Sequence, residues 1–313
     1  MFEHLQLMSI KTTFEKILEF LTKKYKQANA LSGGVLEIIR MTFMRFGEER
    51  GAEASASLAY YSFFSIFPML LVFIAVGSFF VDPVIVRAQL LNLLRGVLPG
   101  VEGVIIENIN QVVELRGAVT VFALVSLVWS ATNVFNVLAK NINRAFPNAS
   151  VPDFLKARQL GFFMFMGLGL LMILSLAVST LSGWIPTSKI FVNGQTLDET
   201  FLWKIGALLV PIVINLLMFW AMYQWVPTVE VSTGASVVGG LVAGLAWELL
   251  NNGFTFYLSS GLSQYRLIYG SVGTVVALLF WIYLTATICL LGAHLTAAIQ
   301  AREMEKSEHQ AAV

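Results

Sequence analysis

The sequence predicts an all-α fold, a polytopic membrane bundle of six transmembrane helices with short amphipathic helices at the membrane surface. Of the 313 residues, 57% are hydrophobic and only 12% are charged, whereas soluble domains carry about 25% charged residues. The mean hydropathy is +0.75. Several apolar runs are also long enough to cross the hydrocarbon core of a bilayer, which takes a helix of about 20 residues.

We expect three parts along the chain. Residues 1–50 form cytoplasmic amphipathic helices, residues 51–300 form the six-span membrane domain, and residues 301–313 form a polar, frayed tail. A cleavable signal peptide is not expected, because the first apolar run follows a charged region of about 50 residues. The expected spans are 54–80, 118–138, 160–184, 201–226, 234–258 and 269–300.

Amphipathic segments lie outside these spans. In residues 1–30, apolar and lysine-rich faces at helical spacing favour a helix on an anionic membrane surface, or else a solvated cap on the bundle. Ser32-Gly33-Gly34 ends this segment, and residues 35–46 form a second short amphipathic helix. Residues 82–117 have helical periodicity on both sides of Pro99-Gly100, which predicts surface helices in this connection.

The fifth span contains the most unusual residue for a membrane helix, the acid Glu248. Gly240, Gly244, Glu248 and Asn251 share one side of the helix. An ionised acid at the membrane centre costs roughly 3 kcal/mol on insertion scales, so Glu248 is expected to face other helices or a wet cavity. Gly240 and Gly244 form a G-x-x-x-G pair, which allows close approach of a neighbouring helix. Glu248 is either a protonated group that bonds a neighbour or a functional acid.

Polar residues on the first two spans complete the predicted pathway. Ser62 and Ser65 lie on the small-residue face of span one, and Asn133 and Asn136 begin a polar stripe on span two that continues through Lys140 and Asn143. Such amides need partners in lipid, so they either bond a neighbouring helix or line a passage. The predicted substrate or ion pathway consists of Glu248, Asn133, Asn136, Asn251, Ser62 and Ser65.

Cations at the end of span two predict the orientation of the chain. The connection that follows carries Lys140, Arg144, Lys156 and Arg158 against one acid, Asp153. By the positive-inside rule this side is cytoplasmic, and with six spans both termini are cytoplasmic too. Lys140 and Arg144 are also candidates for holding a lipid phosphate, although the positive-inside rule alone accounts for them.

Two spans contain an internal proline, Pro68 in span one and Pro211 in span four. An internal proline frees a backbone carbonyl and kinks a helix. Each kink serves either packing or gating.

The motifs together resemble a known family. They are ASLAYYSFFSIFPMLL in span one, LVWSATNVFNVLAKNINRAF in span two, the Val226-Pro227 turn, and YGSVGTVVALLFWIYLTATICLLGAHLTAAI in span six. In order and spacing they resemble the YihY/BrkB family over about residues 45–300. The resemblance implies a six-span bacterial inner-membrane protein, from a family formerly labelled ribonuclease BN, with links to serum resistance and envelope lipid handling. Many relatives carry an acid where this chain has His294, which implies a pH-sensitive or changed role there.

Residue chemistry argues against the ribonuclease label. Metal-dependent RNA cleavage needs clustered His and Asp ligands, but two of the three histidines, His4 and His309, lie in the tails. The sequence also offers no basic groove with interleaved aromatic residues for nucleic acid. We therefore expect no enzyme activity, catalytic residue, metal or cofactor, and no nucleic-acid partner. The alternative enzyme is a membrane hydrolase that uses His294 with span-one serines.

Transport or lipid handling fits the sequence best, with a polar cavity around Glu248. The alternative is a scaffold of envelope assembly with a packed, dry interior. The expected partners are membrane lipids and unidentified envelope proteins. Small-residue faces allow a homodimer without requiring one.

Overall fold

In the computed structural model, the described part of the chain is helical apart from one short strand pair. The described residues are 24–25, 27–77, 121–150, 155–163, 166–167, 191–192, 195–196, 201–259 and 265–311. Residues 1–23, the surface helices predicted in 82–117 and most of the predicted span 160–184 lie outside the described residues.

Most of the described elements are helices, and the longest of them contain the long apolar runs of the sequence. Two antiparallel strands, β1 (Phe191–Val192) and β2 (Gln195–Thr196), form the strand pair. The helices are α2 (Val35–Glu48), α3 (Gly51–Gly77), α6 (Val121–Ala145), α8 (Phe201–Trp225), α9 (Thr233–Ser259) and α10 (Tyr265–Ala311). Both α3 and α8 continue without a break through their internal prolines, Pro68 and Pro211.

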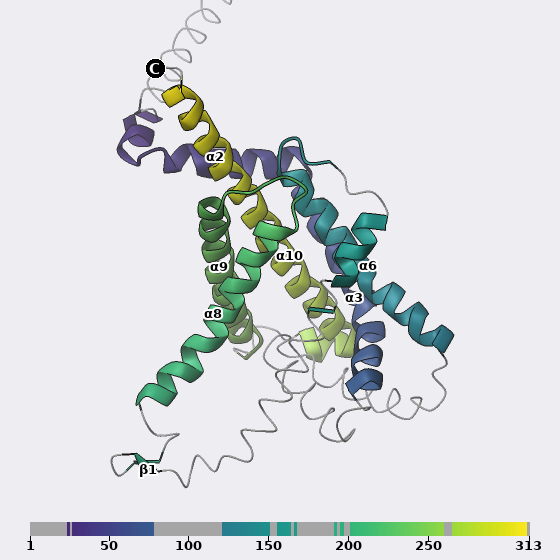
Figure 1. The fold of residues 1–313 in the computed structure, drawn as a ribbon. Helices are drawn as coiled ribbons and strands as arrows, with labels where there is room; N and C mark the ends of the chain where they lie inside the picture. The colour runs from purple at the N-terminus through teal and green to yellow at the C-terminus, as the bar shows by residue number, and fades with distance from the viewer. Residues whose placement is uncertain are drawn as a thin grey trace, which may run out of the picture.

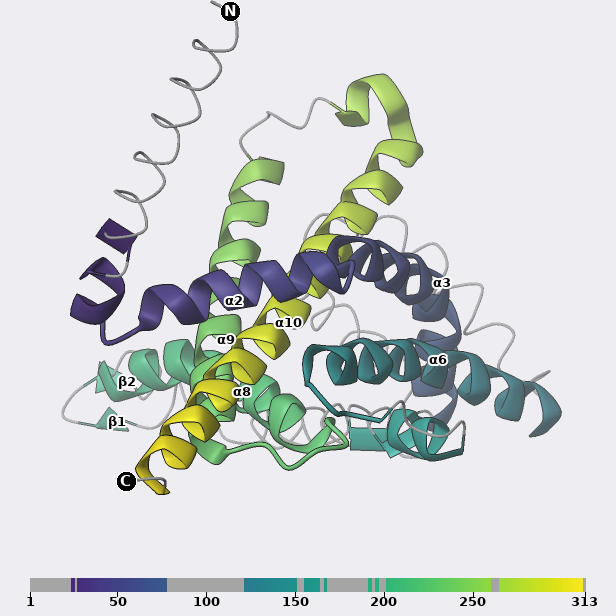
Figure 2. The same cartoon turned by 90° about the horizontal axis from the view of Figure 1, so that it is seen from above.

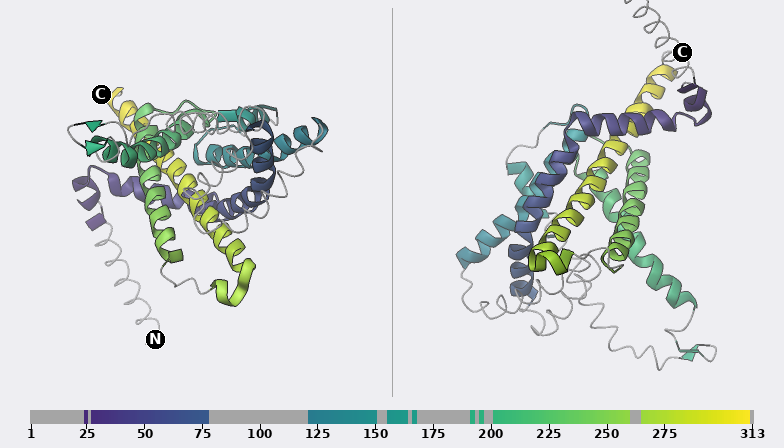
Figure 3. Two further views of the ribbon diagram at one scale, coloured as in Figure 1. Left: turned by 90° about the horizontal axis from the view of Figure 1, so that it is seen from below. Right: turned by 180° about the vertical axis from the view of Figure 1, so that it is seen from behind.

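Helix α10 is the centre of the arrangement. It packs against α9 on one side and against α3 on the other, while α8 packs on α9 and α6 packs on α3 (Figures 1 and 3). With 47 residues, α10 is about 70 Å long at the helical rise of 1.5 Å per residue. It is therefore much longer than a hydrocarbon core of about 30 Å.

The polar tail of the chain is helical rather than frayed as far as Ala311. Residues 301–310, AREMEKSEHQ, are mostly strong helix formers, so the helix of the sixth span extends into them. This extension brings Arg302 to the start of α2, where its Nη2 donates to the Gly33 carbonyl at 2.6 Å.

Helix α2 lies across one end of the bundle and crosses α10 (Figures 1 and 2). The turn before it requires two glycines, because Gly33 and Gly34 have φ of 61° and 87°, a region that other residues rarely adopt. The predicted break at Ser32-Gly33-Gly34 is thus present. The outward face of α2 exposes large apolar side chains, including Phe43 at 62%, as expected for a helix at a membrane surface.

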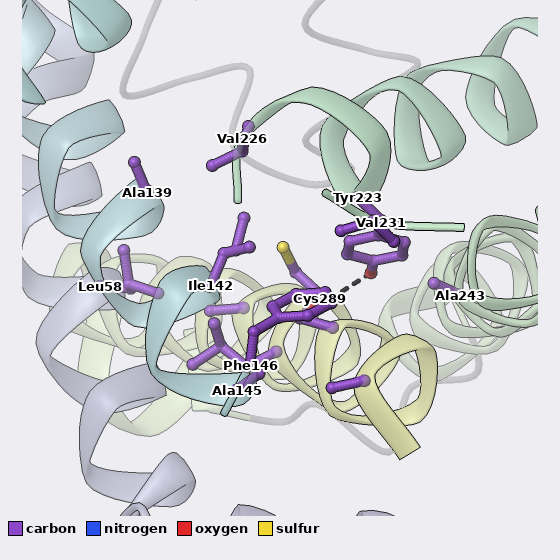
Figure 4. Close-up of a cluster of buried hydrophobic side chains, with 14 residues drawn as sticks. Leu58, Ala139, Ile142, Ala145, Phe146, Tyr223, Val226, Val231, Ala243 and Cys289 are labelled. Atoms are coloured by element: carbon purple, nitrogen blue, oxygen red, sulfur yellow. Dashed lines mark hydrogen bonds between the residues drawn. The ribbon is translucent and has the colours of Figure 1, made fainter. Parts of the chain in front are cut away.

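The core lies near the same end as α2 and consists largely of small residues. Ala139, Ala293 and Ala297 are almost fully buried, and they let α6 and α10 approach closely. Tyr223 of α8 is completely buried, and its hydroxyl donates to the Cys289 carbonyl of α10 at 2.8 Å (Figure 4). A side chain at Gly292 would overlap this hydroxyl.

Two of the described helices are long and apolar enough to cross a membrane, over Thr233–Leu258 and Val275–Glu308. The outward side of α9 is largely apolar, with Leu249 exposed by 75% and Phe256 by 69%. In water such a surface would be unfavourable, whereas in a bilayer it contacts acyl chains.

Candidate functional site

A groove lined by charged residues lies at the end of the bundle that α2 covers. It has a volume of about 610 Å³, within the range of roughly 300 to 1,000 Å³ that is typical of small-molecule sites. We call it the charged groove. Its lining residues are Glu48, Glu49, Arg50, Glu53, Ala54, Ser57, Tyr61, Val137, Lys140, Asn141 and Arg144.

The two walls of the charged groove carry opposite charges. The end of α2 and the start of α3 supply three acids, Glu48, Glu49 and Glu53, whereas α6 supplies Lys140 and Arg144. Glu53 is already paired with Arg50 of its own wall at 2.6 Å. Among the described residues, the salt bridges are this one and Arg40–Glu37, so none joins the two walls.

The charged groove adjoins an exposed aromatic surface on α3. Tyr61 lines the groove, and Tyr60 and Phe64 beside it are exposed by 58% and 57%. Tyr60 and Phe64 also contact each other, with ring centroids 4.8 Å apart. Exposed aromatic residues are enriched where a membrane protein passes from lipid to water. The groove thus borders a surface whose tyrosines are of the kind found at membrane interfaces.

Buried amides hold neighbouring segments together. Asn143 of α6 is 2% exposed, its Nδ2 donates to the Val226 carbonyl at 3.2 Å, and its Oδ1 accepts from the Thr228 backbone N–H at 2.7 Å. Gln300 of α10 similarly donates to the Glu230 carbonyl at 2.8 Å. These bonds fix the turn between α8 and α9 against α6 and α10, which also fixes the α6 wall of the groove.

Asn136 also bonds a neighbouring segment. With its amide oriented to satisfy both atoms, Asn136 donates to the Ala157 carbonyl and accepts from Arg158 Nη1 at 2.9 Å. The Arg158 guanidinium lies 3.4 Å from the centre of the Trp129 ring and donates to the Trp129 carbonyl at 2.7 Å. A largely apolar cavity of about 440 Å³ adjoins this pair.

Glu248 is partly buried on α9. Asn252, one turn later, donates to its Oε1 at 3.3 Å and to its backbone carbonyl at 2.9 Å. On the preceding turns, Gly240 and Gly244 lie against α8, where added Cβ atoms would come 2.7 Å from the Trp220 nitrogen and 2.6 Å from Leu216 Cδ2. Glu248 lines neither of the two cavities described above, nor a third, apolar cavity of about 280 Å³ between α2, α9 and α10.

The structure does not bring the predicted pathway residues together. Glu248 and Asn251 belong to α9, which packs on α8 and α10. The other four belong to α3 and α6 on the opposite side of α10 (Figure 1), where Ser65 is buried and donates to the Ser130 carbonyl at 3.5 Å. Ser62 and Asn133 are partly buried there, as is Asn251 on α9.

By contrast, the two predicted headgroup residues, Lys140 and Arg144, do share one cavity, the charged groove. The sequence reasoning missed its acidic wall. The signal was the run Glu48-Glu49-Arg50 with Glu53 directly before the first span, nearly ninety residues away from Lys140.

His294 is buried where α10 meets α2, at 2% exposure, and its ring contacts Phe46 edge-on with centroids 5.8 Å apart. Its Nδ1 and the Arg45 Nη1 are both buried and have no hydrogen-bond partner within the described structure. Among the described residues, no three His, Cys, Asp or Glu side chains are placed to hold a metal ion.

Comparisons with known proteins point to one family. A family model described as Virulence factor BrkB matches residues 42–313. The Putative ribonuclease-like protein YfkH of Bacillus subtilis is 24% identical over 88% of this chain and 99% of its own length. UPF0761 membrane proteins of Aeromonas salmonicida and Pseudoalteromonas atlantica are 27% and 28% identical, over 87% and 86% of this chain and 92% and 88% of their own.

No solved structure matches the chain. The family model nevertheless covers all the described helices from α3 onward and the second half of α2. Its relatives are named membrane proteins, in agreement with the two long apolar helices. The chain therefore belongs to the BrkB family and is an integral membrane protein.

Proposed function

We propose that this chain is a six-span protein of the bacterial inner membrane that transports or otherwise handles envelope lipids. The observation that carries the proposal is the charged groove, which has Lys140 and Arg144 on one wall and aromatic side chains of α3 beside it. A lipid bound there would place its phosphate against the cations and its acyl chains along the apolar surface of α3.

Geometry supports the proposed orientation. The end of α6 with Lys140 and Arg144, helix α2, and the last turns of α10 all lie at one end of the bundle (Figure 1). If this basic end is cytoplasmic, both termini are cytoplasmic, as an even number of spans requires. The orientation is tested by labelling the variant Ser307→Cys/Cys289→Ala with a membrane-impermeant thiol reagent. Labelling of intact cells from outside would contradict it.

The proposal is tested by the lipid composition of the inner and outer membranes. Cells lacking the protein are complemented with the wild type, with the double variant Lys140→Ala/Arg144→Ala, or with Lys156→Ala. Lys156 is an exposed cation of the same cytoplasmic connection that does not line the groove. We expect the wild type and Lys156→Ala to restore the lipid distribution and the double variant to fail. A distribution that is unaffected by loss of the protein would contradict lipid handling.

A scaffold without transport is the second candidate function. It is favoured by the use of buried amides as bonds between helices, as at Asn143 and Gln300. A scaffold requires a rigid interior but no headgroup site, so the groove variants should leave both lipid distribution and envelope integrity intact. Envelope defects in cells that lack the whole protein, without any change in lipid distribution, would favour the scaffold.

A further inference from the structure

The charged groove has one negatively charged wall and one positively charged wall, whereas a site for a simple anion needs only positive charge. After Glu53 is paired with Arg50, Glu48 and Glu49 are left on the acidic wall, and Lys140 and Arg144 on the basic wall. Within the described residues these four groups form no salt bridge with one another. Arg144 only donates to the Asn141 side chain on its own helix, at 3.3 Å.

We infer that the charged groove binds a headgroup that contains both a phosphate and a primary amine, as in phosphatidylethanolamine. This inference rests on the proposed lipid function and names the class of lipid. The phosphate binds Lys140 and Arg144, and the ammonium binds Glu48 and Glu49. One ligand thereby neutralises the charged groups of both walls, which would otherwise be solvated by water.

Charge complementarity also explains why an anionic lipid fits less well. A phosphatidylglycerol headgroup offers a phosphate to Lys140 and Arg144, but it gives Glu48 and Glu49 only neutral hydroxyl groups. Without an ammonium between them, that phosphate and the two carboxylates would also repel each other across the groove, and like charges in an interface oppose binding. The acidic wall therefore acts as the selective element and the basic wall as the general phosphate contact.

The aromatic surface argues for a lipid rather than a free aminophosphate compound. Tyr61 lines the groove, and the exposed Tyr60 and Phe64 continue from it along α3. A soluble compound would gain nothing from these side chains. A lipid gains apolar contact for the first part of its acyl chains, and removal of that surface from water favours binding.

The test uses the full-length protein in nanodiscs that contain equal amounts of phosphatidylethanolamine and phosphatidylglycerol. Lipids retained on the protein are counted by native mass spectrometry. We expect the wild type to retain up to about fivefold more phosphatidylethanolamine, which is the selectivity that an exposed charge pair can provide. In Glu48→Gln/Glu49→Gln this preference should disappear, while total lipid retention persists.

Control variants separate this inference from the proposed function. Glu305→Gln removes an exposed acid of α10 that does not line the groove and should keep the wild-type preference. If Lys140→Gln/Arg144→Gln retains lipid as the wild type does, lipid binding in the groove itself is contradicted. If that variant loses lipid but Glu48→Gln/Glu49→Gln keeps the wild-type ratio, only the aminophosphate selectivity is overturned. Melting curves verify that each variant is folded.

A soluble probe distinguishes the source of the headgroup. Glycerophosphoethanolamine, which lacks the acyl chains, should displace the lipid only at concentrations far above the Kd of the lipid. If it binds as tightly as the lipid does, the acyl chains contribute nothing and the ligand is a free aminophosphate compound. That result would overturn the lipid part of the inference.

Discussion

At the scale of single residues, one face of α6 carries polar side chains with two different roles. Asn143 is buried and bonds the turn between α8 and α9. Lys140, one turn earlier, is exposed and lines the charged groove. The sequence predicts the stripe that contains both, but periodicity cannot say which neighbouring segment each side chain meets. The structural role of Asn143 therefore follows only from the packing of α6 against α10 and against the turn between α8 and α9.

Replacing Asn143 tests its structural role. Asn143→Ala removes three hydrogen bonds. Two of them join α6 to the turn after α8, so the buried Val226 carbonyl and the Thr228 N–H lose their partner. Such losses cost about 1 to 3 kcal/mol, so the melting temperature in detergent should fall by several degrees. Asn252→Ala is the matched control, because the exposed Asn252 bonds only within α9. Equal melting temperatures for both variants would contradict the role of Asn143.

The functional role of Glu248 stays a prediction. Its carboxylate is partly buried and accepts from Asn252 at 3.3 Å. Glu248→Gln keeps the shape and the hydrogen-bonding capacity of the side chain but removes the charge. We expect normal membrane abundance with impaired activity in the lipid-distribution assay. If this variant complements fully at equal abundance, Glu248 is a structural group rather than a coupling one.

At the scale of helices, the close contact between α8 and α9 depends on glycine. Gly240 lies directly against the backbone of Trp220, and Gly244 lies against Leu216. This agrees with the expectation for a G-x-x-x-G pair, because the missing side chains let two helix backbones approach. The sequence could predict the close approach but could not identify α8 as the partner.

Two alanine substitutions on α9 should therefore have opposite effects. In Gly240→Ala the new Cβ lies 2.7 to 2.8 Å from Trp220 backbone atoms, and overpacking of this kind typically costs about 1 to 3 kcal/mol. In Gly253→Ala nothing lies within 4 Å, and alanine is favoured in a helix by up to about 1 kcal/mol over glycine. Thermal unfolding in detergent measures both. A Gly240→Ala variant as stable as Gly253→Ala would contradict the packing.

Hydrophobic runs were sufficient to predict most helix positions, but not how far the helices extend or how they assemble. The predicted span 234–258 corresponds to helix α9, Thr233–Ser259, because this helix begins and ends where the apolar run does. Helix α10 continues to Ala311, well past the predicted span end at 300, because helix formers continue where apolar residues stop. The charged groove could not be predicted, since its two walls are far apart in the chain.

At the scale of the whole molecule, α10 separates the bundle into two sides. Helices α8 and α9 lie on one side, and α3 and α6 lie on the other (Figure 1). The single polar cavity expected around Glu248 would have needed residues from both sides. The described structure instead has a polar groove on the α3–α6 side, at the end crossed by α2. Lipid handling in this account therefore begins at the membrane surface rather than at mid-membrane.

The central claim is that a lipid headgroup occupies the charged groove. Its most direct test is a cryo-electron microscopy map of the full-length protein in nanodiscs that contain phosphatidylethanolamine. We predict headgroup density between the end of α2 and the end of α6, with the phosphate beside Lys140 and Arg144 and the acyl chains along Tyr60 and Phe64. A well-resolved groove in which Lys140 and Arg144 instead bond Glu48 and Glu49 directly, without lipid between them, would contradict the account.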